Sequence, residues 1–349
     1  MSRFSNVATS ALVAGSLTVS GAALAQDETV SLQLANAYPT AANLVGPAAD
    51  SLAADIERLS GGTIEVETFA PGALLPPAEY FDALSSGALD AAFIDTLPWT
   101  GKDIAFAMFT NVPFGPGAPE FLAWMRHGGG QEQAQNLFHA YGIEPIACGL
   151  IAPEGGGWYK EPIESVEDFD GLKFRVGGLG GNVLQRLGVA AQNLGGGEVL
   201  QALQLGMLDG AEYSMPSIDK SLGFQSVAKY YYFPAWQSQS TIVTLQLSKP
   251  KWDSMSEAQQ NAVRDACELN IISMLAEGEF EQAKAMQELQ EAGVEFLDYP
   301  QEVLDALRES WEIVAQEQAE RSPKFAEVWE SYSAFREEYS AWGERGYLK

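Results

Sequence analysis

The sequence predicts an α/β protein built from two lobes. Strand-like and helix-like segments alternate in two separate stretches, and such alternation gives parallel strands with helices on both faces of a sheet. The chain has 349 residues, which is more than one compact core usually holds. A later stretch has the pattern of a single helix long enough to run across both lobes.

The first lobe is predicted over residues 26–149. Its strands are marked by alternating or fully apolar runs, and its helices end at glycines. We expect strands at 30–35, 63–69 and 91–94 and helices at 43–60 and 76–86. Part of the later segment 240–292, which includes a β-rich run at 241–247, should complete this lobe.

The second lobe is predicted over residues 150–239, after a strand at 146–151. Ser165 and Asp168 have the spacing of a capping box before a short turn. The remaining elements are expected as strands at 172–176, 191–194 and 210–213 and helices at 180–187 and 198–205. Two α/β units joined by strands favour a ligand cleft between them.

The rest of the chain is predicted to be mainly helical. Residues 256–292 are expected to form one spanning helix, capped by Ser256 and ended by Gly293. At 1.5 Å per residue that helix would be roughly 55 Å long. Residues 293–349 form a C-terminal helical region with an aromatic stripe, namely Phe325, Trp329, Tyr332, Phe335, Tyr339 and Trp342. This stripe should pack either on its own lobe or on a second subunit, which would give a homodimer.

Residues 1–25 have the pattern of a secretory signal peptide. Arg3 precedes an uncharged run at 8–23, and Ala23-Leu24-Ala25 matches a cleavage site. We therefore expect a protein exported to the periplasm. The net charge is −27, from 20 basic and 47 acidic residues, so nucleic acid is a poor partner.

Two cysteines, Cys148 and Cys267, are present. Export makes a disulfide chemically possible. However, Cys148 lies in an apolar strand-like run and Cys267 in the middle of a helix, so two buried thiols are favoured over a bridge. Their spacing does not match a metal site.

The sequence has few residues suited to enzyme catalysis. The two histidines, His127 and His139, have no neighbours that would form a triad or a zinc site. We therefore predict a binding protein and not an enzyme. The alternative is an exported enzyme that uses Glu212 as a base on a small organic acid in the same cleft.

Arg175 is the strongest candidate ligand-binding residue. It ends an apolar strand and precedes a glycine-rich turn at 177–181. Ligands of parallel α/β sheets lie at the carboxyl ends of strands, and a guanidinium pairs with a carboxylate or sulfonate through two hydrogen bonds. The turn is expected to bring backbone close to the ligand at a helix N-terminus. The alternative for Arg175 is a surface residue paired with an Asp.

Other candidates follow predicted strands or glycine turns. Polar and aromatic side chains at such positions suit the walls of a small-ligand site. These candidates are Glu212, Tyr213, Ser214, Trp236, Gln237, Gln239, Trp99, Glu154 and Tyr159. A packed core for Trp99, and an ordinary solvated loop for Glu154 and Tyr159, are the alternatives.

Several segments together resemble the solute-binding proteins of TRAP transporters, the DctP type. They are GLKFRVGG at 171–178, GGGEVLQALQLGMLDGAEY at 195–213, YYYFPAW at 230–236 and LLPPAEYFDALSSGALD at 74–90. The resemblance covers essentially the whole chain after residue 25. It is greatest to the branch that binds α-keto acids and related small monocarboxylates.

The resemblance implies a hinge between the lobes, an Arg175 that grips the ligand's carboxylate, and a membrane permease as partner. It also implies that an acid at the position of Glu212 helps to hold a bridging cation. This sequence departs from that pattern, because Trp236-Gln237-Ser238-Gln239 contains no acid and Tyr213 replaces the usual Trp. No cofactor is therefore expected, and a different small acid or a sulfonate remains open as the ligand.

Overall fold

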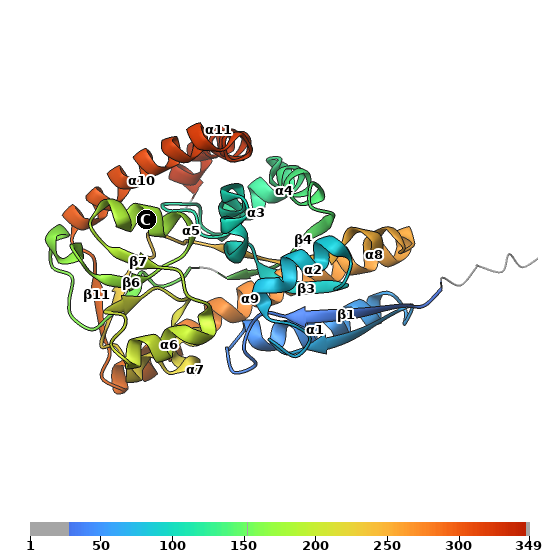
Figure 1. The fold of residues 1–349 in the computed structure, drawn as a ribbon, viewed down its shortest axis with the longest axis horizontal. Helices are drawn as coiled ribbons and strands as arrows, with labels where there is room; N and C mark the ends of the chain where they lie inside the picture. Colours follow the sequence, from blue (N-terminus) through green and yellow to red (C-terminus); the bar gives the residue numbers. More distant parts are fainter. Residues whose placement is uncertain (1–27, 152, 347–349) are drawn as a thin grey trace, which may run out of the picture.

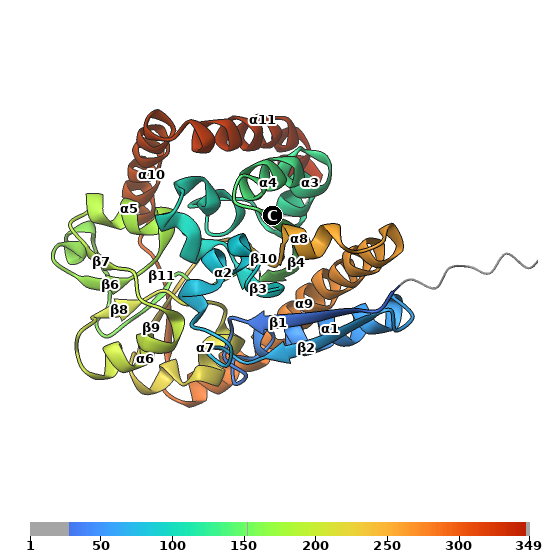
Figure 2. The same ribbon diagram turned by 45° about the vertical axis from the view of Figure 1, so that its right-hand side comes forward.

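The computed structural model describes residues 28–151 and 153–346. The chain forms two lobes, each built around one sheet, with helices packed on them (Figures 1 and 2). The predicted two-lobed α/β fold is therefore confirmed. The predicted signal peptide lies outside the described residues. Within the described ranges, no helix is both long and apolar enough to cross a membrane.

The first sheet has the strand order β2-β1-β3-β10-β4. Its strands are β1 (Val30–Asn36), β2 (Ile64–Phe69), β3 (Ala91–Asp95), β4 (Ile143–Ile151) and β10 (Thr241–Ser248). β1 pairs in parallel with both β2 and β3, as the alternation predicts. β10 returns from the later part of the chain and lies antiparallel between β3 and β4. All residues of β4 and β10 are buried, so this insertion completes the core of the first lobe.

The second sheet has the strand order β11-β9-β5-β8-β6-β7. Its strands are β5 (Gly157–Tyr159), β6 (Lys173–Arg175), β7 (Ala190–Gln192), β8 (Gly210–Ala211), β9 (Tyr230–Phe233) and β11 (Glu295–Asp298). β6 pairs in parallel with both β7 and β8. The carboxyl ends of β6 and β8 therefore lie side by side at one edge of the sheet, where ligands of α/β proteins bind.

The helices cover both sheets and connect the lobes. The α-helices are α1 (Val45–Leu59), α2 (Tyr80–Ser86), α3 (Ala118–His127), α4 (Gly130–His139), α5 (Gly178–Arg186), α6 (Gly196–Gln204), α7 (Pro216–Leu222), α8 (Lys249–Asp253), α9 (Glu257–Glu291), α10 (Gln301–Arg321) and α11 (Pro323–Gly346). Short 3₁₀ helices are η1 (Pro77–Glu79), η2 (Leu97–Gly101), η3 (Ile104–Phe109), η4 (Val166–Phe169) and η5 (Phe224–Ser226). The predicted capping box of Ser165 and Asp168 begins η4.

The long helix α9 has 35 residues and begins with a capping box between Ser256 and Gln259. In its first half, the Asn270 side chain donates to the Cys148 carbonyl of β4 at 2.6 Å. In its second half, the Gln282 side chain accepts from the backbone N–H of Ser217, in the first turn of α7, at 2.9 Å. One helix thus contacts both lobes (Figure 2).

The cysteine prediction is wrong, because Cys148 and Cys267 form a disulfide. The strand β4 packs directly against α9, and the two Cα atoms are 4.1 Å apart. The residues are 119 positions apart in the sequence. Local patterns identified both as buried but did not reveal that the strand and the helix face each other.

Most of the C-terminal aromatic stripe packs on its own chain. Phe325 and Tyr332 are buried, and the Tyr332 ring meets the Trp124 ring of α3 edge-on at 5.2 Å. Figure 1 shows α10 and α11 lying along the outer side of both lobes. Trp342, near the end of α11, is 60% exposed.

We expect the disulfide to contribute substantially to stability. A bridge between residues this far apart restricts the unfolded chain, and removing a native disulfide costs about 2–5 kcal/mol. Urea unfolding of the wild type and of the double variant Cys148→Ala/Cys267→Ala should show this difference. Adding reductant should lower the stability of the wild type and leave the variant unchanged. Equal stability of the two oxidised proteins would contradict the prediction.

Candidate functional site

The candidate site begins with two side chains at the carboxyl ends of neighbouring strands. Arg175 is the last residue of β6, and Glu212 follows β8 directly. The register pairs Arg175 with Ala211, and the Glu212 N–H donates to the Arg175 carbonyl at 2.9 Å. Parallel pairing therefore places the guanidinium and the carboxylate next to each other.

Arg175 is only 7% exposed. Its Nη1 donates to the Glu212 backbone carbonyl at 2.6 Å and to Glu212 Oε2 at 3.1 Å. Its Nε donates to the Leu194 carbonyl at 3.3 Å, and its guanidinium carbon lies 5.7 Å from the centre of the Tyr213 ring. Within the described part of the chain, its Nη2 forms no hydrogen bond. One edge of the guanidinium can therefore accept an anionic ligand.

Glu212 and Asp95 interact electrostatically with this guanidinium, and a third acid, Glu154, interacts with Glu212. Burial raises the pKa of the Glu212 carboxyl to about 7, although Arg175 acts to lower it, and Asp95 raises it further. Burial also raises the pKa of Asp95. It raises the pKa of Glu154 well above its usual range, and the charge of Glu212 raises that pKa further. Two carboxyl groups thus share the electrostatic field of one guanidinium, so additional positive charge would favour the binding of a further anion.

Asp95 and Tyr38 form the side of the site contributed by the first lobe. Asp95 ends β3 and accepts a hydrogen bond from the Tyr38 hydroxyl at 2.9 Å. Burial first, and then the Asp95 charge, raise the pKa of Tyr38, so the hydroxyl keeps its proton. Neither residue is among the sequence predictions. The position of Asp95 at the carboxyl end of a parallel strand was the signal that could have found it.

Glu154 and Gln237 come from two of the connections between the lobes, β4 to β5 and β9 to β10. Glu154 accepts from the Asn111 amide at 3.2 Å, and Gln237 donates to the Gly155 carbonyl at 2.7 Å. Gln237 is 1% exposed, and its Oε1 has no hydrogen-bond partner among the described residues. The same holds for the buried hydroxyl of Ser214. Buried polar atoms are nearly always satisfied, so these two atoms are free to bind a ligand.

Four other residues were predicted for the site, and they contact different parts of the chain. Trp236 is buried beside Gln237, while Gln239 donates to the Ala235 carbonyl within its own connection. Tyr159 lies in the sheet core, where its hydroxyl and that of Tyr299 are 2.8 Å apart. Trp99 belongs to the core of the first lobe, because its indole donates to the Gln246 side chain at 3.1 Å.

The glycine-rich turn makes a close approach to the other lobe. A Cβ atom added at Gly177 or at Gly178 would lie 2.9 Å from the Leu97 side chain of η2. The Asn43 N–H also donates to the Ser221 hydroxyl across the lobes at 3.1 Å. The prediction placed a ligand against this turn, whereas the structure places the Leu97 side chain there.

Comparison with known proteins assigns the fold to a family. Residues 35–322 match the model of bacterial extracellular solute-binding proteins, family 7, known as DctP. A monocarboxylate 2-oxoacid-binding periplasmic protein from Nostoc sp. is 31% identical over 294 residues, which is 84% of this chain and 81% of that protein.

Two solved structures are similar over most of their length. A TRAP transporter solute-binding protein from Bordetella bronchiseptica, a mixed-occupancy dimer with calcium and picolinate, is 32% identical at a TM-score of 0.88, covering 90% of this chain and 94% of that one. Another from Pseudoalteromonas atlantica, with sodium and pyruvate, is 28% identical at a TM-score of 0.86, covering 90% and 96%. The resemblance seen in the sequence is confirmed, and the chain belongs to family 7 of the bacterial extracellular solute-binding proteins, the DctP family of TRAP transporters.

Proposed function

We propose that this protein captures a small organic acid between its two lobes and delivers it to the membrane permease of a TRAP transporter. The observation that carries the proposal is Arg175, a buried guanidinium at the carboxyl end of β6 whose Nη2 has no hydrogen bond among the described residues. A carboxylate on that edge would form a charge-assisted pair in a site of low dielectric. The proposal includes a periplasmic location after cleavage of residues 1–25. It also places the boundaries between the two lobes near residues 149/150 and 239/240.

We favour a small 2-oxo acid or related monocarboxylate as ligand. The buried carboxyl groups of Glu212 and Asp95 already interact with Arg175, so a second negative charge on the ligand would add repulsion. The similar protein from Nostoc binds monocarboxylate 2-oxoacids, and the one from Pseudoalteromonas holds pyruvate. Both observations agree with a ligand that has one carboxylate.

A cation bound together with the ligand is a further part of the proposal. The described residues contain no cluster of three or more His, Cys, Asp or Glu side chains that could hold a metal ion. Glu212, Glu154 and the unpaired Oε1 of Gln237 nevertheless supply oxygen donors, which hard cations prefer. Such a cation would offset the carboxylate charges and leave coordination positions for the ligand's own oxygens.

Binding without catalysis is favoured over an exported enzyme. In the enzyme alternative, Glu212 would act as a base. Its carboxylate is instead paired with Arg175 at 3.1 Å, and the chain belongs to a family of solute-binding proteins. Mass spectrometry of the ligand released from purified protein distinguishes the two, because a binding protein returns its ligand chemically unchanged.

A homodimer through the C-terminal helices is a further part of the proposal. The similar protein from Bordetella is a dimer. Here the side chain of Trp342, near the end of α11, is 60% exposed.

Substitution of Arg175 should weaken binding of pyruvate strongly. Truncating one partner of a buried charge pair costs about 2–5 kcal/mol, which corresponds to roughly 30- to several-thousand-fold in affinity. Calorimetry should show this loss for Arg175→Ala and partial recovery for Arg175→Lys, which keeps charge but loses the planar fork. Arg186→Ala removes an arginine that pairs with Glu317 at the surface and serves as control. Similar affinities for all four proteins would refute the role of Arg175.

Removal of divalent cations should lower the affinity for pyruvate. Protein dialysed against EDTA should bind pyruvate at least about tenfold more weakly than the same protein with added calcium chloride, since ligand and cation binding stabilise each other reciprocally. Gln237→Leu should reduce this difference, because it removes one oxygen donor while keeping a similar volume. If calcium leaves the calorimetric affinity unchanged, the cation has no part in binding.

The isolated protein should sediment as a dimer at micromolar concentration. Trp342→Ser should shift the equilibrium toward monomer, because burial of this exposed side chain would stabilise the interface. Met207→Ser, which changes an apolar side chain that is 55% exposed on the second lobe, should have no effect. A wild type that sediments as a monomer would exclude the dimer.

A further inference from the structure

Phe114 has a backbone conformation that is unusual for its size. It lies in the loop between η3 and α3 and has a φ angle of 52°. A bulky residue in this left-handed region is an outlier, and such strain persists only where the surrounding contacts impose it. Strained residues of this kind cluster at functional sites, so the contacts of Phe114 are informative.

The inner contacts of Phe114 are with the connection from β9 to β10. Its N–H donates to the Trp236 carbonyl at 2.6 Å, and the two rings lie 6.2 Å apart at an angle of 38°. Trp236 is followed by Gln237, whose amide donates to the Gly155 carbonyl on the other connection between the lobes. Phe114 therefore contacts the segment that presents Gln237 to the candidate site.

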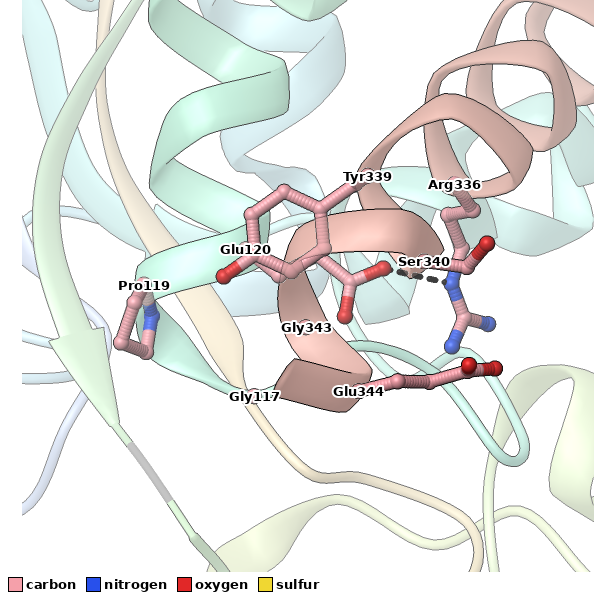
Figure 3. Close-up of a pocket in the computed structure, with 8 residues that line it drawn as sticks. All are labelled: Gly117, Pro119, Glu120, Arg336, Tyr339, Ser340, Gly343 and Glu344. Atoms are coloured by element: carbon pink, nitrogen blue, oxygen red, sulfur yellow. Dashed lines mark hydrogen bonds and ion pairs between the residues drawn. The ribbon is translucent and has the colours of Figure 1, made fainter. Parts of the chain in front are cut away.

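The outer contacts of Phe114 are with both C-terminal helices. The Arg308 guanidinium of α10 lies 4.1 Å from the centre of its ring, and Arg336 of α11 donates to its carbonyl at 3.0 Å. Arg336 is itself held by Glu120 at 2.9 Å, an ion pair seen beside a pocket of about 400 Å³ between α3 and α11 (Figure 3). Two arginines on separate helices thus fix one strained residue.

The rest of the loop is attached to the same connections. Asn111 donates to Glu154 at 3.2 Å, and the Pro116 carbonyl accepts from the Ser240 hydroxyl at 2.9 Å. Phe114 lies between these two contacts. The loop therefore follows the chain segments that cross between the lobes and does not merely fill a surface gap.

We propose that Phe114 is a positioning residue, which holds Trp236 and Gln237 in the orientation that the ligand site needs. Arg308 and Arg336 supply the outer support that keeps Phe114 in its left-handed conformation. Its effect on affinity rests on the proposed binding of a small organic acid. Its effect on the connection at 234–241 is independent of any ligand.

Hydrogen exchange and calorimetry test this role in the full-length protein. In Phe114→Ala without ligand, we expect faster exchange in peptides covering 234–241, and an affinity for pyruvate reduced about tenfold or more, consistent with the loss of aromatic contacts. Phe114→Tyr keeps the ring and should restore both to near wild-type values. Phe280→Ala, which truncates a phenylalanine that is 80% exposed, should change neither.

Unchanged exchange at 234–241 in Phe114→Ala would overturn the proposal, as would failure of Phe114→Tyr to restore binding. If Phe114→Ala does not fold, the same exchange measurement on Arg308→Gln decides the proposal. This variant removes the cation over the Phe114 ring without truncating Phe114 itself. A wild type that does not bind pyruvate would contradict the proposed ligand instead, and the exchange result would still decide the role of Phe114.

Discussion

The ion pair between Arg175 and Glu212 is the interaction on which the site depends. Both groups are buried, so each loses hydration on folding, and their mutual attraction must offset this loss. The offset is incomplete, since burial still raises the pKa of Glu212 to about 7. Nη2 of Arg175 has no hydrogen bond among the described residues, so an incoming carboxylate can bind there beside Glu212.

Strand pairing holds this ion pair in place within the second lobe, and the long helix α9 connects the two lobes. Parallel pairing of β6 with β8 sets the spacing between the two charged residues. The disulfide and Asn270 attach the first half of α9 to β4, and Gln282 attaches its second half to the start of α7. A helix fastened to both lobes limits the relative motions they can make, which favours one hinge-like closure over many unrelated displacements.

The fold was predictable because its signals are local, and so was the placement of Arg175 and Glu212 at one edge of the second sheet. The alternation of strands and helices predicts both lobes, and Arg175 and Glu212 each follow a strand at the edge where parallel sheets bind ligands. Features that depend on distant contacts were not predictable. The disulfide requires β4 to face α9, and the place of β10 between β3 and β4 requires the chain to return to the first sheet. Trp99 follows a strand, as the predicted site residues do. Only its hydrogen bond to Gln246, which is distant in the sequence, shows that it belongs to the core.

The strongly acidic composition and an anionic ligand are compatible because the relevant electrostatics are local. Surface carboxylates act on the cleft through water and salt, which screen charges beyond about 10 Å. The buried acids that interact with Arg175 directly or through Glu212 include Asp95, Glu154, Asp219 and Glu212 itself, and their pKa values are raised. An acid with a raised pKa carries less charge at neutral pH than an exposed one, and it can also share a cation with the ligand. Buried acids that are partly neutral therefore repel an anionic ligand less than exposed acids would, and a cation bound with the ligand would offset the charge that they keep.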